Sequence, residues 1–293
     1  MFEKDTNKFP DYVTFGRTFE KYRWYRPILT IIVSFVLLFV FQFILMAIFS
    51  TIYGPMNFLN AVMGGYDTLN SSDASVYFSY LSIAAFLPAL YIASRLVHDR
   101  PFSSYSSSRG GWDWKIYFKC LIIPLIVYAV YTVVDLAIHG PKGHAGQVSQ
   151  IVLVVSVILI PLQCIAEEYM FRGLLMQTFG SWIKIPILAV IVQALIFAML
   201  HPYNIIGVIT ILISGLVFGL LAWQTNGLEA GAALHSVNNL MGFYVVVLGL
   251  GTLSSAVSVF DSLADILVAV ISALLIYYIG SKKGWFDQKT SES

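Results

Sequence analysis

The chain has 293 residues, of which 58% are hydrophobic and 11% are charged, and its formal net charge is +1. Soluble globular domains carry about 25% charged residues, so this composition excludes an ordinary soluble protein, and the high hydrophobicity excludes a disordered chain. The small net charge excludes an extended basic surface, so we expect no nucleic-acid partner. We therefore predict an integral membrane protein.

Apolar runs follow one another along the chain, each near the length of about 20 residues that an α-helix needs to cross the hydrocarbon core. They lie at 28–52, 76–97, 117–138, 149–178, 186–201, 204–224, 228–250 and 261–280. These runs predict an all-α fold, a polytopic membrane helical bundle with about eight transmembrane helices. We expect one membrane domain over residues 27–280, with the lipid bilayer as its surroundings.

Lysine and arginine gather before the first run, between the second and third runs, and after the last run, whereas the loop at 53–75 has neither. Because cytoplasmic loops are enriched in these residues, we predict that both termini are cytoplasmic, in what we expect to be a bacterial cell membrane. Residues 1–26 are predicted to form an interfacial segment and residues 281–293 a cytoplasmic tail. The Ser- and Gly-rich stretch 101–114 is typical of a flexible connector.

Few polar side chains interrupt the apolar runs, and such residues usually face the protein interior or a water-filled cavity. Cys120 and Cys164 lie within apolar runs, which excludes a disulfide framework or a Cys-based zinc site. The ionisable groups are Asp135, Glu167, Glu168, Arg172, His201 and His235, with Asn238 and Asn239 as polar neighbours. These few residues are the candidates for chemistry.

Helical spacing places some of these side chains on shared faces. Glu168 and Arg172 are four residues apart, so we predict an ion pair that makes their burial tolerable, whereas Glu167 points elsewhere and is free to act as a general base or acid. His235 and Asn239 have the same spacing. Phe197 is predicted to pack on His201, where Pro202 favours the end of a helix.

Two hairpins are predicted, turning near Gly180 and at Asn226-Gly227. At 1.5 Å per residue, Glu167, His201 and His235 would then lie at overlapping depths, so a single buried polar site is possible.

Structural interpretations remain open for each of these residues. Glu168 and Arg172 could be a purely structural pair, each histidine could be a buried hydrogen-bond donor, and Asn239 could bridge helices. A proton-coupled transporter is a further alternative, in which Asp135 joins Glu167 and the two histidines in a relay. The sequence shows none of the internal symmetry that many transporters have.

In chain order, the sequence contains EEYMFRG at 167–173, FAMLH at 197–201 and HSVNN at 235–239. These segments resemble the EExxxR, FxxxH and HxxxN motifs of the CAAX-protease and bacteriocin-processing family of membrane proteins, also called the Abi family. The resemblance covers about residues 148–250. It implies a hydrolase, namely an intramembrane endopeptidase that cuts a membrane-associated peptide or protein.

The resemblance also implies roles for individual residues. Glu167 and His201 would activate the attacking water, while His235 and Asn239 would stabilise the oxyanion. Glu168, Arg172 and Phe197 would support them. Either no metal is needed or the enzyme is a zinc metalloprotease, in which case Glu167, His201 and His235 would be the ligands. No HExxH motif is present.

The biological role implied by the resemblance is peptide maturation, bacteriocin immunity or surface-protein processing. An alternative is a proteolytically inactive member of the same family that acts as an immunity or scaffold protein.

Overall fold

The computed structural model describes residues 9–63, 72–146, 148–252 and 256–287. Within these ranges the chain is helical, and an isolated bridge between Ser107 and Gly227 is the β-type pairing found there. The predicted all-α bundle is confirmed.

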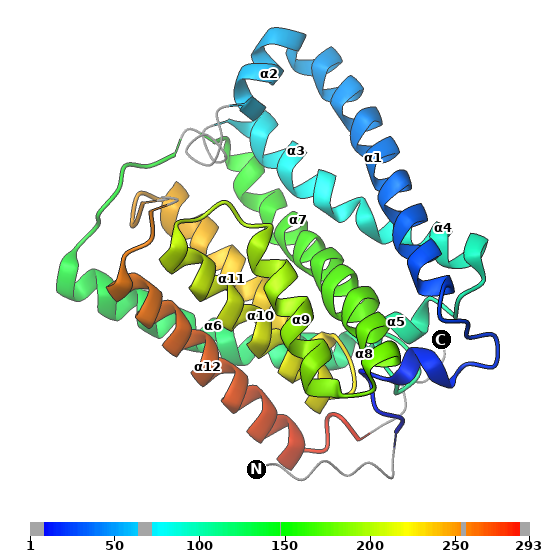
Figure 1. The fold of residues 1–293 in the computed structure, drawn as a ribbon. Coiled ribbons are helices and arrows are strands. Elements are labelled where there is room, and N and C mark those ends of the chain that lie inside the picture. Colours follow the sequence, from blue (N-terminus) through cyan, green and yellow to red (C-terminus); the bar gives the residue numbers. More distant parts are fainter. Residues whose placement is uncertain (1–8, 64–71, 147, 253–255, 288–293) are drawn as a thin grey trace.

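Figure 1 shows the helices as a bundle in which α11 lies among α6, α7, α10 and α12. The elements in chain order are η1 (Phe15–Thr18), α1 (Arg26–Tyr53), α2 (Pro55–Met63), α3 (Asp73–Ala84), α4 (Phe86–Val97), α5 (Ser103–Ser106), α6 (Trp114–His139), α7 (Gln150–Glu168), η3 (Tyr169–Met176), α8 (Gln177–Ile183), α9 (Pro186–Met199), α10 (Ile205–Gln224), α11 (Glu229–Val247) and α12 (Val259–Lys282).

Each of the predicted apolar runs is helical, but the number of membrane spans differs from the expected eight. Over the described residues, 6 helical segments are long and apolar enough to cross a membrane: 26–53, 73–97, 114–139, 150–183, 205–224 and 259–282. Helix α9 has only 14 residues. Helix α11 is not among the six, because its apolar residues are interrupted by polar side chains in the interior of the bundle.

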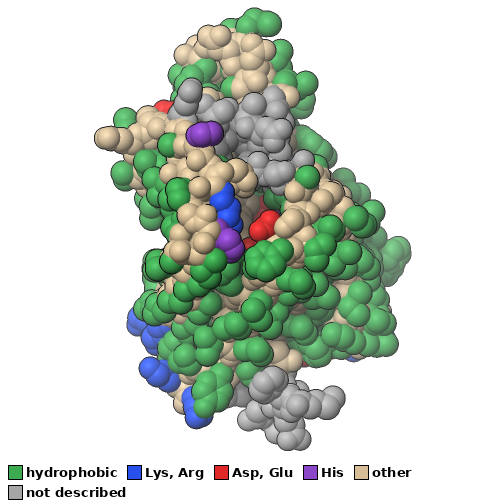
Figure 2. Space-filling model, turned by 90° about the vertical axis from the view of Figure 1, so that its left-hand side faces the viewer, with side chains coloured by type: hydrophobic (Ala, Val, Ile, Leu, Met, Phe, Trp, Pro, Cys, Tyr) green, Lys and Arg blue, Asp and Glu red, His purple; other side chains and the backbone are tan. Residues whose placement is uncertain are grey.

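Exposed large hydrophobic side chains cover the outer faces of α1, α6 and α12. Figure 2 shows one side of the molecule, where hydrophobic side chains form a broad band and Lys and Arg gather toward the lower end. An apolar band of this kind is what a lipid-facing surface requires, so the fold is that of an integral membrane protein.

The turn of the first hairpin, predicted near Gly180, lies at Lys184, a few residues further along the chain. The fourth run continues without a break through α7, the π-helical η3 and α8, and reverses at Lys184, which has a φ of 62°. Gly180 does not mark a turn. It lies inside α8, where a Cβ would overlap the backbone of Val13, so the glycine allows the N-terminal segment to approach closely. The second turn, at Asn226-Gly227, is as predicted.

Two segments cover the lower end of the bundle in Figure 1, and we call residues 9–25 and 98–113 together the basic-end cap. Arg109 Nη2 lies 2.6 Å from Glu229 Oε2, with both side chains buried. Trp223 Nε1 donates to Asp11 Oδ2 over 2.7 Å. The Tyr12 hydroxyl donates to the carbonyl of Tyr105. Burial raises the pKa of Tyr12 well above its ordinary value, because removal from water disfavours the phenolate.

The cap corrects the prediction of a flexible connector at 101–114. Residues 104–109 are buried, because the serine hydroxyls satisfy nearby backbone groups and the segment packs against the turn between α10 and α11. In the N-terminal segment Trp24 is 67% exposed, and the interfacial position of this segment stays a prediction. Tyr12 and Val13, by contrast, are buried in the bundle.

Candidate active site

A buried carboxylate, Glu168, lies at the centre of the polar cluster. Its Oε1 accepts hydrogen bonds from Arg172 Nη1 at 3.0 Å and from His235 Nδ1 at 2.9 Å. The predicted ion pair with Arg172 therefore forms, and it also extends to α11. Glu168 is the last residue of α7, and the chain then continues as the π-helix η3, a form that often occurs at functional sites.

Arg172 is held by aromatic rings as well as by charge. Its guanidinium carbon lies 4.5 Å from the ring centre of Phe197 and 5.3 Å from that of Phe218. Nη2 donates to the carbonyl of Gly215 over 3.1 Å. These contacts tie η3 to α9 and α10.

His235 has a carboxylate beside each of its ring nitrogens. Nδ1 contacts Glu168, and Nε2 lies 3.5 Å from Glu167 Oε2. The ring stacks on Phe218, with the ring centres 4.9 Å apart. The two carboxylates differ in their access to solvent, because the Glu167 side chain is 12% exposed and that of Glu168 is 0% exposed.

A chain of amides continues from His235. Asn239 Nδ2 lies 3.4 Å from His235 Nε2 and 3.3 Å from Gln163 Oε1. Asn239 Oδ1 accepts from Asn238 Nδ2, and Asn238 Oδ1 accepts from the hydroxyl of Tyr128 on α6. Asn238 and Asn239 therefore form one connected network.

His201 lies just beyond the end of α9, as the proline after it predicted. Its Nδ1 is 2.7 Å from the carbonyl oxygen of Phe197. Because a carbonyl can only accept, Nδ1 carries the proton and the Nε2 of a neutral ring is left with a lone pair. The centre of the Phe197 ring is 4.6 Å from the centre of the His201 ring and 6.1 Å from that of the His235 ring. One aromatic side chain therefore packs against both imidazoles.

The predicted site residues thus come together to different degrees. Glu167, Glu168, Arg172, His235 and Asn239 form direct contacts, and His201 is linked to them through Phe197. Asp135 does not take part. Asp135 lies near the C-terminal end of α6, where it is paired with His139 and Lys142. The relay of Asp135, Glu167 and the two histidines that a proton-coupled transporter would need is therefore not assembled.

The predicted alternative metal ligands do not form a cluster. Across the part of the chain that the structure describes, no group of three or more His, Cys, Asp or Glu side chains is placed to hold a metal ion. Glu167 and His235 are close, but His201 is not gathered with them into a ligand set. This conformation therefore does not fit a zinc ion on those three residues, and whether the protein uses zinc stays a prediction.

Several residues at the site gave no signal in the sequence. Gln163 accepts from both Asn239 and Cys164, yet it is a single polar residue in an apolar run. Phe218 and Tyr128 belong to apolar helices in which aromatic residues are common. The Gly215 carbonyl accepts from Gln193 as well as from Arg172, and a backbone acceptor has no sequence signature.

Residues 149–241, which contain every group described above on η3, α9 and α11, match the family described as "Type II CAAX prenyl endopeptidase Rce1-like". This segment is therefore similar to that family, which confirms the resemblance inferred from the three motifs.

The chain is also similar to a protein of Bacillus subtilis (strain 168) that bears the description "Uncharacterized protein YyaK". The two sequences are 29% identical over 179 residues, which cover 56% of this chain and 59% of the relative. The match thus spans less than two thirds of the relative's length. No solved structure matches the chain.

Proposed function

We propose that the protein is an intramembrane endopeptidase that hydrolyses a peptide bond of a membrane-associated peptide or protein. The observation that carries the proposal is the position of His235, whose two ring nitrogens each face a carboxylate within a buried cluster. The match of this segment to a prenyl endopeptidase family supports the same reaction type.

Glu167 is proposed as the general base. It is the one of the two carboxylates that keeps some exposure to solvent, and a base must reach the water that it deprotonates. Glu168 is fully buried and already accepts from Arg172 and His235, so we assign it a positioning role. His201, with its Nε2 lone pair, is proposed to share the activation of water.

His235 and Asn239 are proposed to stabilise the oxyanion. Water attacks the substrate carbonyl carbon, Glu167 receives the proton, and the carbonyl oxygen becomes negative in the tetrahedral intermediate. His235 is proposed to donate from Nε2–H in its imidazolium form, which is favoured by the carboxylates of Glu168 and Glu167 beside its two ring nitrogens. The Asn239 amide, beside Nε2, is the second donor. Collapse of the intermediate expels the amine, which takes the proton from Glu167. Fixed donors of this kind lower the barrier because they do not reorganise during the reaction.

The test compares the peptide termini of the membrane proteome in cells that carry the wild-type protein, Glu167→Gln or His201→Ala. Matched controls are Glu20→Gln and His144→Ala, which change exposed residues away from the cluster. We expect new termini with the wild-type protein and with both controls. Cleavage should fall at least about 100-fold in the two site variants, the usual size of a general-base contribution.

Identical termini in all five strains would overturn the proposal and favour an inactive scaffold or immunity protein. Once a substrate is identified, cleavage by the purified protein is measured with and without a chelator. Activity that persists supports a glutamate-dependent site, whereas activity that is lost and is restored by zinc supports a metalloprotease.

A further inference from the structure

A second polar site lies far along the chain from the motif residues, at the basic end of the bundle. A crevice between the first turn of α6 and the residues after α12 is lined by Asp113, Lys115, Ile116, Lys119, Lys283, Gly284 and Trp285. Its volume of about 70 Å³ is several times the ~10–15 Å³ that one water molecule needs on the same kind of measure. The crevice therefore has room for a larger polar group.

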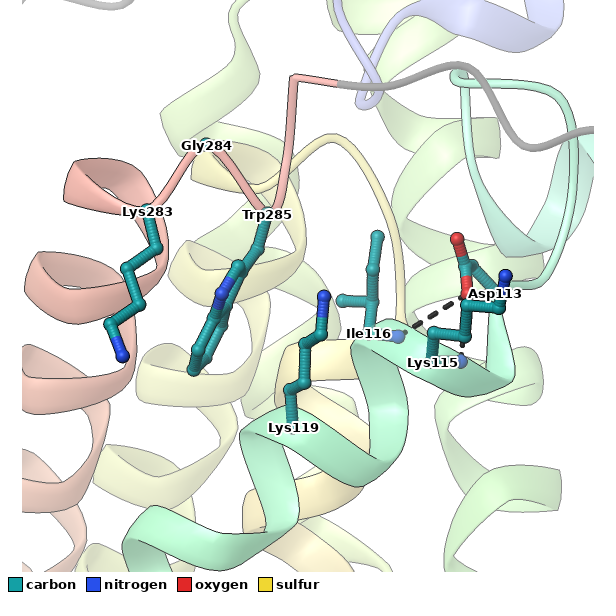
Figure 3. A pocket seen from close by; sticks show the side chains of 7 residues that line it. All are labelled: Asp113, Lys115, Ile116, Lys119, Lys283, Gly284 and Trp285. Atoms are coloured by element: carbon teal, nitrogen blue, oxygen red, sulfur yellow. Dashed lines mark hydrogen bonds between the residues drawn. The ribbon is translucent and has the colours of Figure 1, made fainter.

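The charge of the crevice favours an anion. Lys115, Lys119 and Lys283 are exposed, and none of their ammonium groups forms an ion pair with a carboxylate of the described residues. Figure 3 shows Lys119 beside Trp285, and the ammonium lies 5.8 Å from the ring centre. The ring thus holds one of the three charges in place.

Carboxylates near the crevice do not cancel this charge. Asp113 Oδ1 accepts from the backbone N–H groups of Lys115 at 2.8 Å and Ile116 at 3.3 Å (Figure 3). It therefore caps α6, and the N-terminus of this helix is already occupied. Asp287 lies near Gly284. Three lysines against these two carboxylates leave a positive excess.

The position of the crevice points to lipid. It lies where two membrane-spanning helices, α6 and α12, reach the end of the bundle. The adjoining turns present large exposed side chains, with Trp114 and Phe118 on α6 and Tyr278 on α12, which are 55%, 58% and 55% exposed. Exposed aromatic rings next to lysines are typical of the headgroup layer of a membrane.

We propose that this crevice binds the phosphate of an anionic phospholipid headgroup, with the acyl chains lying along the exposed faces of α6 and α12. Basic pockets between membrane helices are suited to such headgroups, because each Lys near an anionic membrane surface adds to the attraction. The shared chemistry is a phosphate group, which free inorganic phosphate also carries. The proposal does not depend on the peptidase activity.

The test uses the purified full-length protein in a neutral detergent, and native mass spectrometry counts the lipids that it retains. Phosphatidylglycerol is titrated against the wild-type protein and against Lys119→Gln/Lys283→Gln. The matched control is Lys21→Gln/Lys282→Gln, which removes the same charge from the same end but outside the crevice. Phosphatidylcholine and inorganic phosphate are separate arms. Thermal unfolding in the same detergent verifies that each variant is folded.

We expect the crevice variant to bind phosphatidylglycerol at least about tenfold more weakly, and the control to stay within about twofold of wild type. Phosphatidylcholine should be retained poorly by all three proteins. Displacement of phosphatidylglycerol by millimolar inorganic phosphate would support the phosphate site but assign it to the free ion. Equal losses in both double variants, or equal retention of the two lipids, would overturn the proposal.

Discussion

Arg172 is fully buried within a membrane-spanning segment, and one carboxylate, that of Glu168, neutralises its charge. The sequence predicted this pair because the two residues are four apart. It did not predict that Glu168 would also hold His235, because the contact joins residues 67 positions apart in the chain. Local pairs can be inferred from helical spacing, whereas a bridge of this kind depends on how helices pack.

Replacement of Arg172 by methionine should destabilise the protein by about 3–5 kcal/mol, because it leaves the buried Glu168 charge with one partner fewer. The double variant Arg172→Met/Glu168→Gln should regain part of this loss, since no uncompensated charge remains. Chemical or thermal unfolding in detergent measures both. A double variant that is less stable than the single one would contradict this account.

Tyr128 connects to His235 through Asn238 and Asn239. We expect Tyr128→Phe to fold normally and to lower kcat about fivefold with KM unchanged, since a lost hydrogen bond is worth about 1 kcal/mol. Tyr131→Phe, on the next turn of α6, is the control and should leave both constants near wild type. Kinetics on the identified substrate decide this, and a change confined to KM would show that Tyr128 acts on substrate binding instead.

Helix positions followed the apolar runs, because a lipid-facing helix needs a nearly continuous apolar sequence. Helix α2 and the π-helix η3 were not predicted. The first has only 9 residues, too few to cross a membrane, and lies within the stretch 53–75 that was taken for a loop. The second differs from an α-helix only in its hydrogen-bond register. Helix α11 is too polar to be counted as a span and instead supplies His235 and Asn239 to the interior.

Gly173 allows η3 to pack against the basic-end cap. A Cβ at this position would lie 2.9 Å from the carbonyl oxygen of Tyr105, whereas a Cβ on Gly242, in α11, would meet nothing within 4 Å. We expect Gly173→Ala to lower the unfolding temperature and Gly242→Ala to leave stability within about 1 kcal/mol of wild type. The unfolding temperatures of the two variants are compared in detergent. Equal temperatures would show that the basic-end cap can shift to accommodate the added methyl group without loss of stability.

At the scale of the whole molecule, the basic-end cap differs most from what the sequence predicted, which was a flexible connector at 101–114. Serine and glycine between two spans are typical of a flexible loop, and nothing local marks Arg109 as the partner of Glu229. The candidate catalytic residues were easier to identify, because they are polar side chains within otherwise apolar runs. Gln163 is the exception, because it is a single polar residue in an apolar run and forms no recognisable motif with another residue.

The ion pair between Arg109 and Glu229 should limit how readily a protease reaches the basic-end cap. Glu229→Gln leaves the buried Arg109 without a carboxylate, and this should open the cap more often. We expect trypsin to cut after Arg109 at least about tenfold faster in this variant than in the wild-type protein. Glu20→Gln, at an exposed position, is the control. Cleavage at the wild-type rate would show that the remaining contacts hold the cap closed.

The cap also has a consequence for biogenesis. Residues 9–25 and 98–113 leave the ribosome early, but their partners Trp223 and Glu229 are made more than 100 residues later. Until then, Asp11 lacks the indole N–H of Trp223 and Arg109 lacks the carboxylate of Glu229, with which they pair in the complete protein. The early spans can insert one after another, but this end of the molecule can close only once the turn between α10 and α11 has been synthesised. A nascent chain arrested before residue 223 would therefore keep this region open to proteases and chaperones.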